Sequence, residues 1–254
     1  MIAKQLRVAA RLTGVAGLLV CYLPFHAACI VARRPSPWPR RFLGGSAWVA
    51  GVTVRAEGNM AAAPLLLVAN HVSWIDILAL GTTGTAFIAH DGLASHPLLR
   101  LLCGMNGTVF VARHDRARVG AQAVRIAEAL AGTGARGGVL TLFPEGTTGD
   151  GRTLLPFKSA LLAAVEYAPC TVSVQPVLID YGAEAAAIAW TGAEPGLGNV
   201  LRVLARDRPL EVTLRFLPPL MPGERASRKM MARAARERIA SALTADAEAK
   251  TNAA

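Results

Sequence analysis

Cysteine and aromatic residues are scarce in this sequence, and both shortages exclude some classes of function. The four cysteines, Cys21, Cys29, Cys103 and Cys170, form no C-x-x-C pair and match no spacing of metal ligands, which argues against a disulfide framework or a zinc site. Aromatic residues make up only 6% of the chain, so no run of stacking platforms for nucleic acid is present. We therefore expect a reducing compartment, no bound metal and no nucleic-acid partner.

Acidic residues are also few, with 17 Asp and Glu against 27 Lys and Arg. The resulting net charge of +10 and sequence pI near 10.3 favour anionic partners such as phospholipid headgroups, nucleotide-bearing cofactors, acidic carrier proteins or nucleic acid. However, 53% hydrophobic residues and a mean hydropathy of +0.38 are high for a soluble nucleic-acid-binding protein. An anionic membrane surface fits both observations better.

Charged residues are absent from Leu12 to Ala32, a run of about the length that a helix needs to cross a bilayer. We expect Pro24 to interrupt this run. Basic residues flank it on both sides, which favours a segment that lies in, or re-enters from, the cytoplasmic leaflet; they are Lys4, Arg7, Arg11, Arg33, Arg34, Arg40 and Arg41. A second apolar patch, residues 42–54, could complete such an anchor. The predicted location is the cytoplasmic face of the inner (plasma) membrane.

A cleaved signal peptide is the alternative interpretation of this segment. It is supported by the basic start, the apolar stretch and the small residues Ala27 and Ala28. A lipoprotein cleavage site before Cys29 would require an aliphatic residue where His26 stands. The low cysteine content gives no sign of an oxidising destination.

From residue 65 onward, short apolar runs alternate with helix-like segments. This pattern predicts an α/β fold with a single mixed, largely parallel sheet flanked by helices. The expected strands are 65–69, 109–112, 139–143 and 172–179, followed by a strictly alternating strand at 211–216. We expect three parts: an N-terminal membrane-associating segment (1–58), an αβ core (59–223) and a C-terminal helical tail (224–254).

Nucleotide-binding and hydrolase motifs find no support. Residues 132–137 match G-x-G-x-x-G, but they follow a predicted helix and precede a predicted strand, the reverse of the dinucleotide-binding order. The chain has neither a Walker A lysine pattern nor a G-x-S-x-G elbow. A metal site that recruits His90, Asp91, His96 and His114 is disfavoured, because their spacings fit no standard ligand pattern.

The segment Asn70 to Asp76, NHVSWID, places a histidine directly after the apolar run 65–69. In open α/β sheets, ligands gather beyond the carboxyl ends of the strands, where His71 would lie. Asp76 can reach His71 only if the chain turns between them, as it does where a strand leads into a helix. A carboxylate on one imidazole nitrogen leaves the other nitrogen to take a proton from a hydroxyl. The plainer alternative is a surface histidine and a helix N-terminal acid.

Four segments together resemble the glycerolipid acyltransferase family, the lysophosphatidic acid acyltransferases and their relatives. NHVSWID resembles the N-H-x4-D block of that family, and three further blocks follow in the order and approximate spacing of the family; they are GTVFVAR (107–113), FPEGTTGDG (143–151) and VQPVLID (174–180). The resemblance covers about residues 65–180. Each block is a weak pattern alone, but four in order are strong.

This resemblance implies an enzyme that transfers a fatty acyl group to the free hydroxyl of a lysolipid, converting 1-acyl-sn-glycerol-3-phosphate to phosphatidate. The donor would be acyl-CoA or acyl-carrier protein, a co-substrate, with no further cofactor. His71 would be the general base and Asp76 its orienting partner, with direct attack of the hydroxyl on the thioester and no acyl-enzyme. Such a protein need only deprotonate the acceptor, align both lipids and stabilise an oxyanion.

The same resemblance implies the residues that bind substrate. Arg113 and the pair Glu145-Gly146 would hold the acceptor headgroup, while Pro176 would shape the acyl site. The complete predicted set is Asn70, Phe110, Arg113, Glu145, Gly146, Thr147, Lys158 and Pro176. Taken without the family context, Arg113 is a solvated cation at a strand end, Glu145 a turn carboxylate and Lys158 a snorkelling lysine, and Pro176 indicates an edge or bent strand.

Two positions depart from the family pattern. Thr148 stands where a basic residue often follows E-G-T, and His90 stands where a lysine is common. The first change removes an expected phosphate ligand. The longer run FPEGTTGDGRTLLPFKSALL also resembles the branch that acylates lyso-ornithine lipid, whose headgroup carries no phosphate. Lysophosphatidate is therefore the first acceptor predicted, with lyso-ornithine lipid close behind; a thioester hydrolase, a non-catalytic membrane-binding protein and a soluble nucleic-acid-binding module are the rivals.

Overall fold

The computed structural model describes residues 2–111, 119–131, 138–163, 171–192 and 194–252. Seven strands form one sheet in the order β1-β7-β6-β2-β5-β3-β4, and every pairing is parallel except β6 with β7. The strands are β1 Val52–Glu57, β2 Leu65–Ala69, β3 Ala86–His90, β4 Val109–Val111, β5 Val139–Leu142, β6 Ser173–Asp180 and β7 Leu210–Phe216. The predicted mixed, largely parallel sheet is confirmed.

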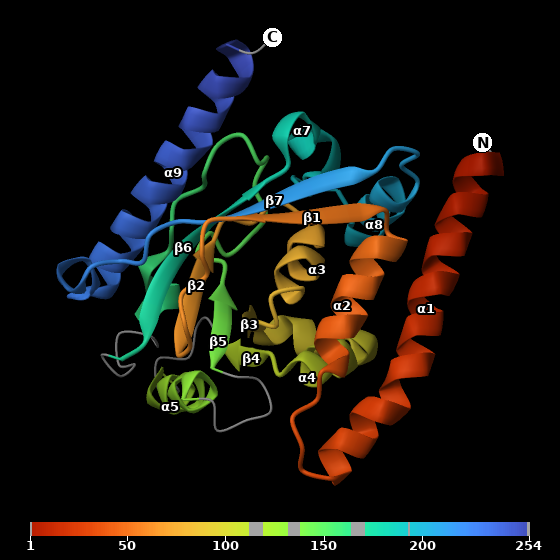
Figure 1. The fold of residues 1–254 in the computed structure, drawn as a ribbon, viewed down its shortest axis with the longest axis horizontal. Coiled ribbons are helices and arrows are strands. Elements are labelled where there is room, and N and C mark those ends of the chain that lie inside the picture. The colour runs from red at the N-terminus through yellow and green to blue at the C-terminus, as the bar shows by residue number, and fades with distance from the viewer. Residues whose placement is uncertain (1, 112–118, 132–137, 164–170, 193, 253–254) are drawn as a thin grey trace.

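Helices cover both faces of this sheet (Figure 1). Helices α1, α2, α3 and α8 lie over one face, and α5 and α9 lie over the other. The α-helices are α1 Ile2–Val31, α2 Trp38–Val49, α3 Ile75–Gly81, α4 Pro97–Asn106, α5 Val119–Leu130, α7 Ala185–Ile188, α8 Gly196–Leu204 and α9 Arg228–Asn252. Short 3-10 helices are η1 Asp91–Ser95, η3 Ser159–Leu162, η4 Gly182–Glu184 and η5 Pro222–Arg225.

Strand β2 is central, and all five of its residues are buried. Because successive side chains of a strand point to opposite faces, β2 contributes to both hydrophobic cores. Leu65, Leu67 and Ala69 join the core beneath α2, α3 and α8, whereas Leu66 and Val68 join the core beneath α5 and α9. Because β2 is buried on both faces, its sequence is a continuous apolar run, and this run directly precedes His71.

Helix α1 is long and apolar enough to cross a membrane, and only 6% of its most apolar window is buried in the protein. It runs unbroken through Pro24, so the expected interruption of the helix at this residue is wrong. Its inner side packs against the core, and Arg7 and Arg11 donate to backbone carbonyls of residues 204–206 at 2.8–2.9 Å. These carbonyls form the C-terminal end of α8, where a positive charge is stabilising.

The second apolar patch, residues 42–54, belongs to the core. In α2, Phe42, Leu43 and Ala47 are buried against the sheet, and β1 pairs in parallel with β7. Most apolar side chains of this patch are thus covered by protein, but Trp48 of α2 is 79% exposed, so the suggestion that the patch completes a membrane anchor stays a prediction. The sheet thus begins at Val52, inside the predicted N-terminal segment 1–58; the three-part division of the chain stays a prediction.

Pro176 lies in β6, an inner strand that pairs with β2 on one side and β7 on the other. Of the two expected alternatives, an edge strand or a bent strand, the edge strand is therefore excluded. Its carbonyl accepts a hydrogen bond from the Leu217 N–H at 3.0 Å, so its absent N–H faces the same side. On that side the Leu217 carbonyl, which an N–H at position 176 would meet, accepts instead from Nε2 of the Gln175 side chain at 2.9 Å, so the missing ladder bond leaves no unpaired carbonyl there.

Candidate active site

The turn between β2 and α3 brings His71 and Asp76 together. The Nδ1 atom of His71 lies 2.7 Å from Oδ2 of Asp76, and the same oxygen accepts hydrogen bonds from the N–H groups of Val72 and Ser73 at 2.7 and 3.0 Å. The Asp76 side chain is fully buried, whereas 20% of the His71 side chain is exposed. Asp76 therefore fixes the backbone of the turn and the imidazole ring at once, and Nε2 of His71 remains to accept a proton.

Tyr181 completes the surroundings of Asp76, a role that no sequence pattern indicated. Its hydroxyl donates a hydrogen bond to Oδ1 of Asp76. Burial, and then the neighbouring Asp76 charge, raise the pKa of Tyr181 well above its ordinary value, so the phenol stays protonated and remains a donor. Both Asp76 oxygens are thus occupied, as a buried carboxylate requires. The only signal in the sequence was its position, directly after Asp180 at the end of the fourth block.

Phe143 fixes the plane of the His71 ring. The two rings are stacked with centroids 4.1 Å apart and an interplanar angle of 18°. Phe87 lies nearly parallel to Phe143, with centroids 6.2 Å apart. Phe143 stood in the third sequence block without an assigned role, and its contact covers one face of the imidazole while Nε2 at the ring edge is left to accept a proton.

Glu145 holds the backbone of the catalytic residue. One carboxylate oxygen accepts a hydrogen bond from the N–H of His71 at 2.9 Å, and the other accepts from the N–H of Leu155 at 3.1 Å. The residue is 2% exposed, and this burial raises its pKa to about 7, while the two backbone hydrogen bonds act in the opposite direction. In this geometry Glu145 positions His71; its predicted contact with the acceptor headgroup stays a prediction.

The loop after Glu145 is also tied to the catalytic turn. The N–H of Gly149 donates to the carbonyl of His71 at 2.7 Å, and a Cβ at Gly149 would lie 3.3 Å from Glu145 Oε2. Gly146 has a φ of +69°, in the left-handed region that favours glycine. Thr147, beside it, is exposed. The glycines of the run E-G-T-T-G therefore stand where the backbone is left-handed (Gly146) and where it packs closely against the catalytic turn (Gly149).

Three predicted residues remain: one lies at the edge of the sheet, one is held by its backbone beside the Glu145 loop, and one lies outside the described residues. Phe110 is in the edge strand β4, separated from β2 by β5 and β3. Lys158 is exposed, and its N–H donates to the Pro144 carbonyl at 2.8 Å. Arg113 lies outside the described residues. Substrate contacts for these residues stay predictions.

Asn70 braces the sheet beside the site. Its side-chain amide donates to the carbonyl of Ile179 at 3.0 Å, and its side-chain oxygen accepts from the N–H of Ile179 at 2.7 Å. The residue is buried. Because both groups of the amide are occupied by β6, Asn70 fixes the end of β2, directly before His71.

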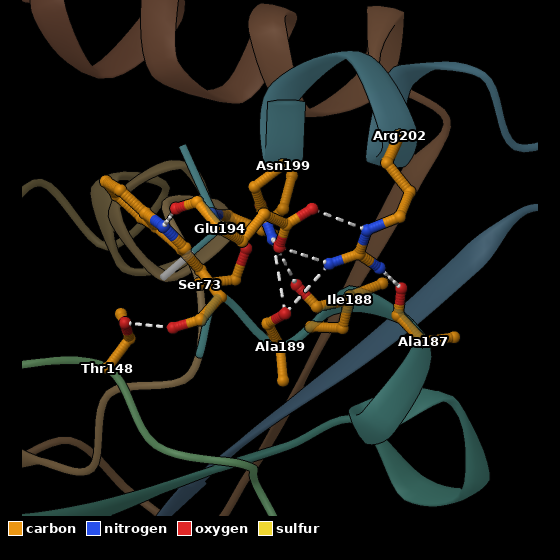
Figure 2. Close-up of polar contacts among 10 residues, drawn as sticks. Ser73, Thr148, Ala187, Ile188, Ala189, Glu194, Asn199 and Arg202 are labelled. Carbon is orange, nitrogen blue, oxygen red and sulfur yellow. Dashed lines mark hydrogen bonds and ion pairs between the residues drawn. The ribbon is translucent and has the colours of Figure 1, made fainter. Parts of the chain in front are cut away.

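The loop that contains Trp190 was not anticipated from the sequence. The N–H of Trp190 donates to the Val72 carbonyl at 3.0 Å, and its carbonyl accepts from the Thr148 hydroxyl. Figure 2 shows Thr148 beside a polar cluster in which Arg202 contacts Glu194 and the carbonyls of residues 187 and 189. This cluster holds the 187–194 loop against the catalytic turn.

Among the described residues, no group of three or more histidine, cysteine, aspartate or glutamate side chains is placed to hold a metal ion. His90 pairs with Asp91, with Nε2 and Oδ1 3.1 Å apart, and its Nδ1 accepts from the Gly92 N–H. His96 precedes α4 as its N-terminal cap residue. His114 lies outside the described residues.

Comparison with known proteins places this site in a family. The profile of the acyltransferase family matches residues 51–180, which include His71, Asp76, Glu145 and Pro176. This chain belongs to the acyltransferase family. The acyltransferase is therefore an enzyme, and the family resemblance seen in the sequence is confirmed.

Individual relatives of the acyltransferase agree with this assignment. It is 34% identical over 235 residues to the lyso-ornithine lipid O-acyltransferase of Rhizobium meliloti (strain 1021), covering 85% of this chain and 79% of that protein. It is 36% identical over 126 residues to the 1-acyl-sn-glycerol-3-phosphate acyltransferase of Neisseria gonorrhoeae, covering 49% and 43%. The crystal structure of the 1-acyl-sn-glycerophosphate acyltransferase PlsC from Thermotoga maritima has the same fold, with a TM-score of 0.66, 21% identity and coverage of 96% and 95%.

Proposed function

We propose that this acyltransferase moves a fatty acyl group from acyl-CoA or acyl-carrier protein to the free hydroxyl of a lysolipid in membrane lipid synthesis. The observation that carries the proposal is the His71–Asp76 pair, with Nδ1 of the imidazole held 2.7 Å from a buried carboxylate. This arrangement fixes the tautomer that has Nε2 as the proton acceptor and stabilises the charged ring once the proton has moved.

The reaction follows from this geometry. Nε2 of His71 removes the proton from the lysolipid hydroxyl while its oxygen attacks the thioester carbonyl carbon and forms the new C–O bond. The C–S bond then breaks, and the thiolate leaves and takes the proton back from Nε2. Asp76 holds the ring in place throughout, because hydrogen bonds from the backbone and from Tyr181 fix its carboxylate. No covalent acyl-enzyme is needed.

Two acceptors fit the site, lysophosphatidate and lyso-ornithine lipid. An arginine at position 148 would bind a phosphate through two charge-assisted hydrogen bonds, whereas the Thr148 hydroxyl already donates to the Trp190 carbonyl. The match to a lyso-ornithine lipid O-acyltransferase spans most of both chains, and the match to a 1-acyl-sn-glycerol-3-phosphate acyltransferase spans less than half of each. These observations favour lyso-ornithine lipid, the second of the two acceptors predicted from the sequence.

A competition assay separates the two acceptors. Purified protein receives one labelled acyl donor, acyl-CoA or acyl-carrier protein, with equal amounts of both lysolipids. We expect preferential acylation of lyso-ornithine lipid, and about a tenfold gain toward lysophosphatidate in Thr148→Arg, because charge-assisted hydrogen bonds contribute about 1.5–3 kcal/mol against about 0.5–1.5 kcal/mol for neutral ones.

The Thr148→Val variant is the matched control, because it keeps the side-chain shape and loses only the hydroxyl that contacts Trp190. A gain in Thr148→Val equal to that in Thr148→Arg would contradict the role of the guanidinium. A strong preference of the wild type for lysophosphatidate that survives loss of Arg152 and Lys158 would overturn the argument from Thr148. Release of free fatty acid with no transfer to any lysolipid would identify a thioester hydrolase instead.

We also propose that the enzyme acts at the cytoplasmic face of the inner membrane. Helix α1 supports membrane association through its length and apolar surface, as do relatives named for membrane lipid substrates. Fractionation of cells followed by N-terminal sequencing tests the location. Intact protein in the inner membrane is the expected result, and a trimmed protein in the periplasm would establish the signal-peptide alternative.

A further inference from the structure

Helix α4 is an apolar helix that lies on the protein surface. Leu98, Leu99 and Leu101 are 50%, 39% and 43% exposed, and Leu93 of the preceding η1 is 44% exposed. A helix that served only the core would bury these side chains. Exposed apolar patches of neighbouring residues mark surfaces that contact a membrane or another protein.

A groove of about 580 Å³ separates α4 from the C-terminal half of α1. Its apolar walls include Leu23 of α1 and Leu101 and Met105 of α4, and Arg100 lies at the same groove. This volume lies in the range of sites that hold small molecules. An apolar groove with a cationic side chain matches a lipid, which has hydrocarbon chains and an anionic headgroup.

The position of α4 links this surface to the catalytic edge of the sheet. Strand β3 runs parallel to β5 and β5 runs parallel to β2, so β3 ends at the same edge as β2, where His71 lies. Helix η1 and then α4 follow β3 directly. On the other side of the groove, α1 has its own exposed apolar residues, with Val20 at 71% and Phe25 at 55%.

We propose that α4 is a second membrane contact, which enters the same leaflet as α1. Leu98, Leu99 and Leu101 would lie among the acyl chains, and Arg100 would reach the phosphate of an anionic lipid. A bilayer is favoured over a protein partner because α4 lies directly across the groove from α1, a helix of membrane-spanning length. This contact holds the edge of the sheet that carries His71 against the membrane, so that a lysolipid reaches the site while its chain stays in the bilayer.

The inference rests on the proposed membrane association and is tested with two triple variants of the full chain. The α4 variant replaces three exposed leucines with serine: Leu98→Ser, Leu99→Ser and Leu101→Ser. The control variant replaces three exposed apolar residues, one on α5, one directly before η5 and one on α9: Val124→Ser, Met221→Ser and Met230→Ser. Helices α5 and α9 lie on the opposite side of the molecule from α1 (Figure 1).

Acyl transfer is measured with a long-chain lysolipid in vesicles of phosphatidylglycerol and phosphatidylcholine, and with a short-chain lysolipid dissolved as monomers. For the α4 variant we expect the KM for lysolipid in vesicles to rise by about tenfold or more, because binding at an interface scales with buried apolar area. Its activity on the monomeric lysolipid should match the wild type. The control variant should match the wild type with both substrates.

Arg100→Glu adds a test of the charge. This variant should lose activity on vesicles that contain phosphatidylglycerol and keep it on vesicles of phosphatidylcholine alone. An unchanged KM in the α4 variant, equal losses with both substrates, or the same loss in the control variant would overturn the proposal. If the wild type acylates neither lysolipid, the proposed function fails, and partitioning of the same variants onto vesicles still decides whether α4 contacts the membrane.

Discussion

Replacing Glu145 with glutamine should change how the stability of the enzyme depends on pH. In the unfolded chain this carboxyl group titrates near 4.5, and in the folded protein its pKa is about 7, because it is buried. Between these two pH values, the folded state keeps a proton that the unfolded state has released. The free energy of unfolding therefore decreases as pH rises through this window, and levels off above pH 7.

The size of the effect follows from the two pKa values. At about 1.4 kcal/mol per pH unit, a rise from 4.5 to about 7 lowers the free energy of unfolding by about 3 kcal/mol at pH 8 relative to pH 4. Glutamine does not titrate, but it offers one oxygen to the two N–H groups of His71 and Leu155. One buried donor then lacks an acceptor, which costs about 1–3 kcal/mol. Glu145→Gln should therefore be less stable than the wild type at pH 5, and at pH 8 it should be equally stable or more stable by up to about 2 kcal/mol.

Urea unfolding in a mild detergent at pH 5, 6, 7 and 8 measures this difference. Asp150→Asn is the matched control, because it makes the same chemical change on the same loop at an exposed carboxylate. Hydrogen bonds from the backbone of residues 152 and 153 lower the pKa of Asp150 below its ordinary value, so its titration lies below the window. The control should follow the wild type from pH 5 to 8. If Glu145→Gln also stayed parallel to the wild type, the raised pKa and its structural cause would be refuted.

Three further predictions concern the catalytic pair and the anchor. His71→Ala should lower turnover by about two to four orders of magnitude, and Asp76→Asn by a similar or smaller factor, with unchanged circular dichroism; near-normal turnover in both would exclude the general-base mechanism. Tyr181→Phe should lower turnover, because Asp76 loses the hydroxyl that fixes its carboxylate beside His71; Thr141→Val, which removes a buried hydroxyl elsewhere in the sheet, should leave turnover unchanged, and equal losses in both variants would contradict a positioning role for Tyr181. Val20→Asp, at an exposed position of α1, should release protein from vesicles, because an acidic residue inside a bilayer helix costs about 2.5–3.5 kcal/mol; full retention would argue against insertion of this face.

Local sequence patterns predicted those strands in which the order of apolar and polar residues matches the burial of their side chains. The run 65–69 is apolar because β2 is buried on both faces, and the alternation in residues 211–216 matches the half-exposed strand β7. The burial of Phe42, Leu43 and Ala47 within the patch 42–54 could not be predicted, because apolar residues that pack into a core look the same in sequence as residues that stay exposed, such as Trp48. The inner position of Pro176 could not be predicted for a related reason: its absent N–H is tolerated because the Gln175 side-chain amide donates to the Leu217 carbonyl, a contact that no strand pattern indicates.

The catalytic pair could be predicted because its two members are close in sequence. His71 and Asp76 are five residues apart, so a turn between a strand and a helix is enough to join them. The groups that hold this pair in place come from distant parts of the chain. Tyr181 and Trp190 reach the turn only through the order of strands in the sheet and the path of the chain after β6, and no local pattern encodes either.

The contacts of Arg7 and Arg11 with the end of α8 make the membrane helix part of the scaffold of the active site. Helix α8 carries Arg202, which holds the loop whose Trp190 backbone contacts the catalytic turn. An unrelated transmembrane helix grafted in place of α1 would keep the enzyme at the bilayer, yet it would leave the carbonyls of residues 204–206 without their cationic donors. Anchoring and catalysis are therefore not separable modules in this enzyme, and chimaeras that exchange the anchor should be made with α8 from the same donor protein.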